Sequence, residues 1–121
     1  MPVFSWAQLG GLTALPFLLL SLTATPALAH NRLLDSRPMN GQVLSAAPPE
    51  LILEFFAPPE PGFSNIELQS GSQWQPLPVS VQNTQLKATL PKLAAGQHSV
   101  RWSVMSRDGH RQNGILTFTV R

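Results

Sequence analysis

Apolar and polar residues alternate along five short stretches of the chain. The stretches are 50–56, 64–69, 85–90, 97–105 and 114–120. The alternation is most regular in "QHSVRWSVM", where one face carries His98, Val100, Trp102 and Val104. A period of two predicts β-strands that bury one face. No stretch of a dozen residues after position 30 shows the 3.6-residue period of a helix, so the pattern indicates an all-β domain.

The segments between these stretches have the composition of turns. They include "RPMNG" at 37–41, "AAPPE" at 46–50, "APPEPG" at 57–62 and "LAAG" at 93–96. Proline presets the backbone for a turn, and Gly and Asn tolerate the left-handed conformation that many turns need. Short strands at this spacing, in a chain with 12 prolines, favour an antiparallel sandwich or barrel.

The first 29 residues differ from the rest and predict a cleaved signal peptide. The apolar run "GLTALPFLLLSL" is followed by "ALA" at 27–29, and signal peptidase accepts small residues at the third and first positions before the cut. The stretch before the run has no Lys or Arg, and Pro16 interrupts the run, so a retained anchor is the alternative. Cleavage after this triplet yields an exported domain of residues 30–121, which begins with His30 and has no membrane-inserted part.

Composition excludes several kinds of site. The chain has no cysteine, which rules out thiolate metal sites, thiol catalysis and disulfides. A net charge of +2 comes from scattered residues with no basic block, so we expect no nucleic-acid partner. Hydrophobic residues make up 43% of the chain, which is enough for one small core. No feature of the sequence predicts the oligomeric state.

Three histidines are the main candidates for chemistry. His98 lies on the inward face of the most regular strand, and we interpret it as a buried structural side chain with a backbone partner. His110 lies in the loop "SRDGH", two positions after Asp108, and the glycine between them allows the chain to turn. As the first residue of the mature chain, His30 offers its α-amine and its imidazole Nδ1 as a six-membered chelate.

These groups together supply three nitrogens and one oxygen. A planar or tetragonal set of nitrogen and oxygen donors favours Cu(II), which also heads the divalent affinity order. Zinc prefers a tetrahedron and is the natural competitor. His30, Asp108 and His110 are therefore candidate ligands for one Cu(II) per chain, and the residues alone leave open the alternative that Asp108 and His110 are a solvated loop pair.

The chain after the leader resembles the CopC family of bacterial periplasmic copper-binding proteins over nearly all of its length. The resemblance rests on His30 after the cleavage site, "DSRP" at 35–38, "APPELILEF" at 47–55, "LAAGQHSVRWSVMSRDGHRQNG" at 93–114 and "FTV" at 118–120. The most specific part is a W-x-x-x-S-x-D-x-H-x-x-x-G pattern. It falls on Trp102, Ser106, Asp108, His110 and Gly114.

This resemblance implies an immunoglobulin-like Greek-key β-sandwich of about seven strands. It implies that the N-terminal histidine, the aspartate and the second histidine of the family site correspond to His30, Asp108 and His110. The implied function is copper homeostasis or resistance, with the protein as a Cu(II) carrier or buffer and no enzymatic activity. The implied partner is an inner-membrane copper transporter of the CopD type.

The chain departs from the family pattern at two places. Some members have a methionine-rich loop that binds Cu(I), whereas only Met39 and Met105 remain here after the leader, apart from each other in sequence. Many members place an acidic residue after the L-x-F strand motif, where this chain has Phe56 and Ala57. The first departure argues against a Cu(I) site, and the second concerns the surroundings of the Cu(II) site.

Two other functional classes remain as alternatives. A copper-dependent oxidative enzyme can also use an N-terminal histidine brace, but a copper-bound carboxylate stabilises Cu(II) and opposes redox cycling. A metal-free immunoglobulin-like interaction module is the other alternative, because the fold by itself implies no function. Trp74, in "SQWQPLP", is expected near a turn and is assigned no role.

Overall fold

The computed structural model describes residues 3, 10–11, 14, 16 and 31–121. The described part of the chain forms nine strands and no helix that is long and apolar enough to cross a membrane. The strands are β1 (Leu33–Arg37), β2 (Val43–Leu44), β3 (Glu50–Phe55), β4 (Asn65–Ser70), β5 (Gln73–Pro76), β6 (Val79–Gln82), β7 (Gln85–Thr89), β8 (Gly96–Met105) and β9 (Arg111–Val120). The predicted signal peptide and His30 lie outside the described residues.

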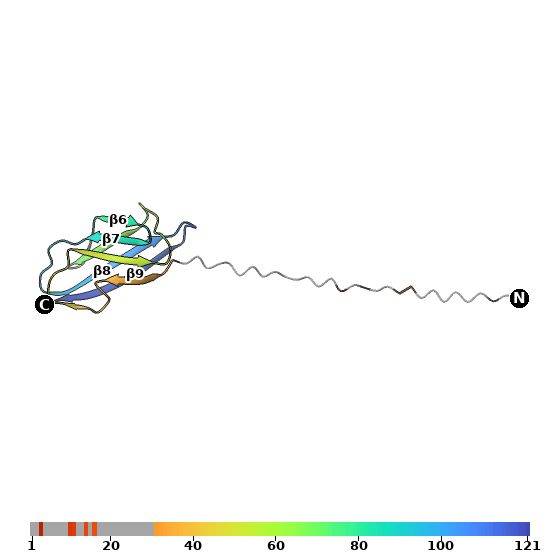
Figure 1. Cartoon of the computed structure of the whole chain (residues 1–121), viewed down its shortest axis with the longest axis horizontal. Coiled ribbons are helices and arrows are strands. Elements are labelled where there is room, and N and C mark those ends of the chain that lie inside the picture. Colours follow the sequence, from red (N-terminus) through yellow and green to blue (C-terminus); the bar gives the residue numbers. More distant parts are fainter. Residues whose placement is uncertain (1–2, 4–9, 12–13, 15, 17–30) are drawn as a thin grey trace.

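These strands form two sheets that pack face to face (Figure 1). One sheet has the order β1-β3-β7-β6, and the other has the order β2-β9-β8-β4-β5. All pairs are antiparallel except β2 with β9. The chain changes sheet five times: on each side of β2, between β3 and β4, between β5 and β6, and between β7 and β8. The predicted Greek-key sandwich is therefore confirmed, as two open sheets and not a closed barrel.

The core consists of the inward positions of the alternating stretches. Leu51, Leu53 and Phe55 of β3 are almost completely buried, and so are their counterparts on β4, β7, β8 and β9. The rings of Phe55 and Trp102 meet edge to face across the two sheets, with centroids 5.2 Å apart and planes at 70°. A period of two thus gave the right buried face on every strand that it predicted.

A close approach inside the core explains one glycine of the family pattern. Gly114 on β9 is the register partner of Trp102 on β8. A Cβ at position 114 would lie 2.3 Å from the Trp102 indole. The ring therefore occupies the space that any other side chain would fill, and the position must remain glycine for the core to close.

Candidate metal centre

The loop 106–110 joins the two longest strands of the domain. β8 and β9 pair continuously from Gly96 with Val120 to Met105 with Arg111. Backbone hydrogen bonds close the loop, from Ser106 N to the His110 carbonyl at 2.9 Å and from the Gly109 amide to the Ser106 carbonyl at 2.9 Å. Gly109 has a φ of 85°, which a residue with a Cβ rarely adopts. A rigid hairpin therefore presents a short, defined loop at its tip.

Within this loop, Asp108 accepts hydrogen bonds from three groups. The Ser106 hydroxyl donates to Oδ1 at 2.6 Å, and the His110 backbone amide donates to the same oxygen at 3.1 Å. The His110 Nδ1 lies 2.7 Å from Oδ2. These donors, the Ser106 hydroxyl foremost, hold the pKa of the Asp108 carboxyl well below its usual range. The carboxylate is therefore ionised at any pH at which the protein works.

This carboxylate also orients the His110 ring, whose side chain is 62% exposed. An imidazole that meets a carboxylate through one nitrogen presents the other nitrogen in a fixed direction. The pair can therefore act in two ways. Both side chains can bind a metal directly, or Asp108 can orient a His110 that binds through Nε2.

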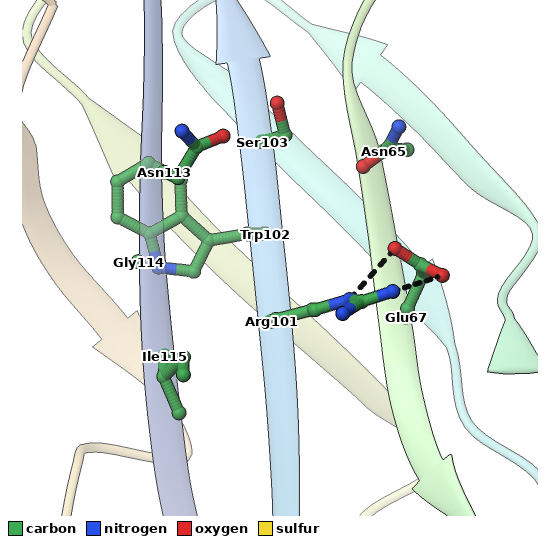
Figure 2. Close-up of a pocket in the computed structure, with 8 residues that line it drawn as sticks. All are labelled: Asn65, Glu67, Arg101, Trp102, Ser103, Asn113, Gly114 and Ile115. Atoms are coloured by element: carbon green, nitrogen blue, oxygen red, sulfur yellow. Dashed lines mark hydrogen bonds and ion pairs between the residues drawn. The ribbon is translucent and has the colours of Figure 1, made fainter. Parts of the chain in front are cut away.

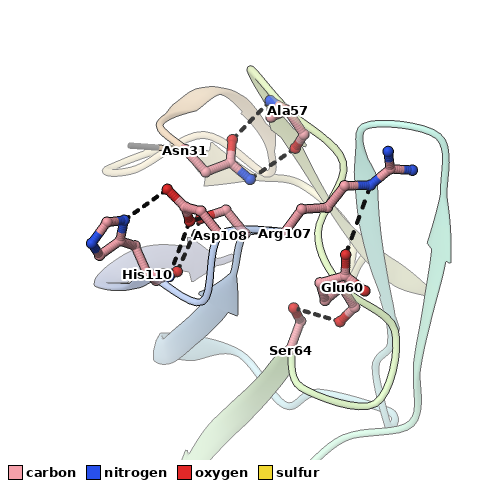
Figure 3. A network of polar contacts seen from close by, with 8 residues as sticks. Asn31, Ala57, Glu60, Ser64, Arg107, Asp108 and His110 are labelled. Carbon is pink, nitrogen blue, oxygen red and sulfur yellow. Dashed lines mark hydrogen bonds and ion pairs between the residues drawn. The ribbon is translucent and has the colours of Figure 1, made fainter. Parts of the chain in front are cut away.

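The start of the described domain lies at the same end of the sandwich as this loop. The Asn31 side chain is buried and pairs with both backbone groups of Ala57, at 2.8 Å in each direction. The loop that follows Ala57 contacts the end of β8, because Glu60 N donates to the Met105 carbonyl at 2.9 Å. Arg107 Nε lies 3.8 Å from a Glu60 carboxylate oxygen. Figure 3 shows these contacts linking Asn31, through the 57–64 loop, to the loop that carries Asp108 and His110.

Two of the three predicted ligands are thus brought together. Asp108 and His110 are in direct contact, whereas His30 lies outside the described residues. No group of three or more potential metal ligands occurs among the residues that the structure describes. The sequence analysis missed Asn31 as the anchor of the chain start and Ser106 as a donor to Asp108. The position of Asn31 directly after the predicted first residue was the only signal for the anchor.

The remaining candidates lie elsewhere. His98 Nε2 meets the Ala94 carbonyl at 2.8 Å and its ring lies 5.9 Å from that of Phe118, so the predicted backbone partner is present. His98 is half-buried and not buried as predicted, because it lies near the start of β8. Met39 and Met105 are not brought together. The turn that contains Met39 is hydrogen-bonded to β9 at Thr117, through the Gly41 amide, whereas Met105 pairs with Arg111, the first residue of β9.

Trp74 belongs to a polar arrangement with Arg101 and Glu67 on the outer face of the five-stranded sheet. Figure 2 shows Arg101 and Glu67. The Arg101 guanidinium lies 4.5 Å from the centre of the Trp74 ring and forms two hydrogen bonds, of 2.9 and 3.1 Å, with the Glu67 carboxylate. A shallow cavity of about 550 Å³ adjoins the pair, but its lining residues are neutral apart from Glu67 and Arg101. It includes neither Asp108 nor His110.

Comparison with known proteins decides the family. The CopC domain profile matches residues 33–121. The chain belongs to the CopC family. Protein YobA of Escherichia coli K12 is 31% identical over 114 residues, which cover 89% of this chain and 92% of YobA.

Two solved structures of this family have the same fold. CopC from Methylosinus trichosporium OB3b has a TM-score of 0.68 and 29% identity, and the match covers 75% of this chain and 93% of that one. PcoC from E. coli, a methionine-rich copper resistance protein, has a TM-score of 0.64 and 27% identity, over 77% and 100% of the two chains. Family membership confirms the predicted resemblance. The relative PcoC is a copper resistance protein, which agrees with the expected class of function, a copper-binding protein and not an enzyme.

Proposed function

We propose that the mature protein is a periplasmic carrier or buffer that binds one Cu(II) ion. The ligands are the α-amine and imidazole of His30, the Asp108 carboxylate and the His110 imidazole. The contact between Asp108 and His110, at the end of the sandwich where Asn31 anchors the start of the domain, is the observation that carries the proposal. Asn31 is the next residue after His30, so the anchor lies where a site shared by residue 30 and the loop requires it.

The donor types favour the oxidised ion. Nitrogen and carboxylate oxygen suit Cu(II), whereas Cu(I) selects thiolate and thioether sulfur. The chain has no cysteine and only three methionines, one of them Met1, while its relative PcoC is described as methionine-rich. Met39 and Met105 are apart in the fold as well as in the sequence. Copper held in this way remains Cu(II), which suits a carrier or buffer better than a redox catalyst.

The site requires that the leader be removed. Residues 1–29 are proposed to be a signal peptide whose cleavage after Ala29 exposes the α-amine of His30. An α-amine has a pKa near ~8, so copper can displace its proton at neutral pH. The same export would bring the protein to the periplasm, where an inner-membrane transporter of the CopD type is the proposed partner for copper transfer.

The experiment compares two proteins that differ by one residue. One begins with His30, and the other has a single glycine before it. The glycine keeps every side chain but moves the amine out of the six-membered ring, so Cu(II) affinity should fall by several orders of magnitude in a chelator competition. Electron paramagnetic resonance of the first protein should show a tetragonal, nitrogen-rich Cu(II) signal at one ion per chain.

Thermal unfolding of both metal-free proteins serves as the control, because the added glycine should leave stability unchanged. Equal Cu(II) affinity in the two proteins would exclude the N-terminal chelate. Tighter binding of Cu(I) than of Cu(II) in the first protein would exclude the proposed oxidation state.

A further inference from the structure

Two phenylalanines are exposed at the end of the domain that carries the candidate metal centre. Phe55 and Phe118 belong to the core, whereas Phe56 and Phe63 are 63% and 58% exposed. Phe56 directly follows β3, and its amide donates to the Arg32 carbonyl at 2.9 Å. The Phe63 carbonyl accepts a hydrogen bond from Arg111 Nη1 at 3.0 Å. Phe56 thus lies beside the start of the continuous described domain, and Phe63 lies beside Arg111, the residue that follows the metal loop.

An arginine contacts each of these two phenylalanines, Arg32 through the Phe56 ring and Arg111 through the Phe63 backbone. The Arg32 guanidinium lies 5.1 Å from the centre of the Phe56 ring, and the Arg111 guanidinium is held on the Phe63 carbonyl and the Ser103 hydroxyl. A third arginine, Arg107, projects from the metal loop with its side chain 84% exposed. Its ion pair with Glu60 is long and weak, at 3.8 Å.

The main cavities among the described residues lie away from this end of the domain. The main cavities of the described part of the chain are lined by strand residues and by turns elsewhere, and none of them includes a residue of 56–64 or 106–110. Exposed rings and guanidiniums on projecting loops, with no groove between them, do not offer a pocket to a peptide. They suit the interface of a lipid bilayer, because each ring can insert into it separately.

The connection to the leader gives the orientation. Asn31, the first residue of the continuous described domain, is fixed at this end, so the apolar segment in residues 1–29 joins the domain here. Before the proposed cleavage, the leader thus holds this end of the domain nearest to the membrane during export. We propose that Phe56, Phe63, Arg32, Arg107 and Arg111 form a peripheral docking surface for an anionic phospholipid bilayer. The inference goes beyond copper binding and does not depend on it.

The contact would be weak and reversible. Each arginine near an anionic surface raises binding by about fivefold, and the effect disappears within a Debye length as salt is added. The two rings add a hydrophobic contribution that does not depend on salt. A bound domain would present Asp108 and His110 to the membrane surface, where a membrane partner could reach a metal held by them.

The test uses the copper-free protein that begins at His30. It is sedimented with vesicles made of equal parts phosphatidylglycerol and phosphatidylcholine, and with vesicles of phosphatidylcholine alone. We expect binding to the anionic vesicles only, weakened at high salt. The double variant Phe56→Ser with Phe63→Ser and the variant Arg107→Glu should each reduce it by about tenfold or more.

Two variants serve as matched controls. Ile115→Ser removes an equally exposed apolar side chain from the face of the five-stranded sheet, and Lys92→Glu reverses an exposed charge in the turn before β8. Both should bind as the parent does, and circular dichroism verifies that all variants fold. The proposal is overturned if the anionic vesicles do not bind the protein, or if the controls weaken binding as much as the test variants do. It is also overturned if ultracentrifugation shows dimers that the double Phe variant abolishes, because a second copy then covers the surface.

Discussion

The two ends of the sandwich each hold a histidine, and the surroundings of the two rings differ. At one end, His98 packs against Phe118 and its Nε2 meets the Ala94 carbonyl. At the other end, His110 lies in an exposed loop and meets the Asp108 carboxylate. The Ala94 carbonyl engages one ring nitrogen of His98 and thereby closes a turn. The Asp108 carboxylate instead brings a negative charge to the His110 ring and a second possible metal ligand. The partner, more than the histidine, therefore distinguishes a structural position from a candidate metal site.

The largest effect expected from this difference is on the pH dependence of copper binding. Two imidazoles and an α-amine must lose their protons before they bind Cu(II). Each displaced proton lowers the apparent affinity by up to about tenfold per pH unit, so the affinity should fall by at least about a thousandfold between pH 7 and pH 5. Competition with a chelator of known pH dependence measures the fall.

Stability should not follow affinity over this range. The pKa of Asp108 is lowered in the folded state, so its contribution is present above its ordinary pKa of ~4 and is lost only as the pH falls further. The protein at pH 5 should therefore be folded and largely free of copper. Simultaneous loss of copper and of the thermal unfolding transition at pH 5 would mean that the site and the fold titrate together, and the comparison of the two ends would fail.

Substitution of the histidines tests the same difference directly. Asp108→Ala and His110→Ala should each weaken Cu(II) binding by at least about 10–100-fold, since each removes a ligand or the group that orients one. His98→Ala should leave the affinity unchanged and lower stability by about 1 kcal/mol, because it loses a hydrogen bond and a ring contact. Isothermal titration and thermal melts of the three variants separate the outcomes. Copper binding that depends on His98 would place the site at the wrong end.

The strands and the metal loop were predictable from sequence to different extents. The inward faces of β3, β4, β7, β8 and β9 followed from the alternation, because a strand with one buried face must repeat every two residues. The short β2, β5 and β6 have two to four residues, too few to show a period. β1 was missed because a register shift between Leu33 and Asp35 interrupts its alternation. Nine strands were therefore found where about seven were expected.

The candidate site was predictable only in part. The pair of Asp108 and His110 could be read from spacing, because two residues in one tight turn have to be neighbours. Asn31 could not, because its partner Ala57 is 26 residues away and no local pattern connects them. The same holds for Arg101 and Glu67, which meet only through the pairing of β4 and β8. Contacts between segments that are distant in the sequence cannot be predicted from a local sequence pattern.

Asn31 gives a smaller effect that connects the fold to the site. Asn31→Ala leaves the amide and the carbonyl of Ala57 without their side-chain partners, which should cost about 1–3 kcal/mol of stability. Because the anchor also holds the residue next to His30, Cu(II) affinity should fall by about tenfold, less than for a ligand. Denaturant unfolding and copper competition on the same samples measure both. Full affinity in a destabilised Asn31 variant would show that the anchor serves the fold alone.

The smallest effect is expected on the sheet face between the two ends, where Arg101 bridges Trp74 and Glu67. The hydrogen bond from Arg101 lowers the pKa of Glu67, so the pair stabilises the fold at neutral pH and loses that contribution as the carboxyl is protonated below its ordinary pKa. Both side chains are partly exposed, at 44% for Arg101 and 24% for Glu67, and solvent screens such pairs to about 0–1 kcal/mol.

Glu67→Gln keeps the shape and one acceptor, so stability should change by less than ~1 kcal/mol and less still at high salt. Copper affinity should be unchanged, because no residue of this arrangement belongs to the metal loop. Trp74 fluorescence reports whether Arg101 has left the ring. A variant in which that signal changes and copper affinity falls tenfold would show that the sheet face and the metal end are coupled.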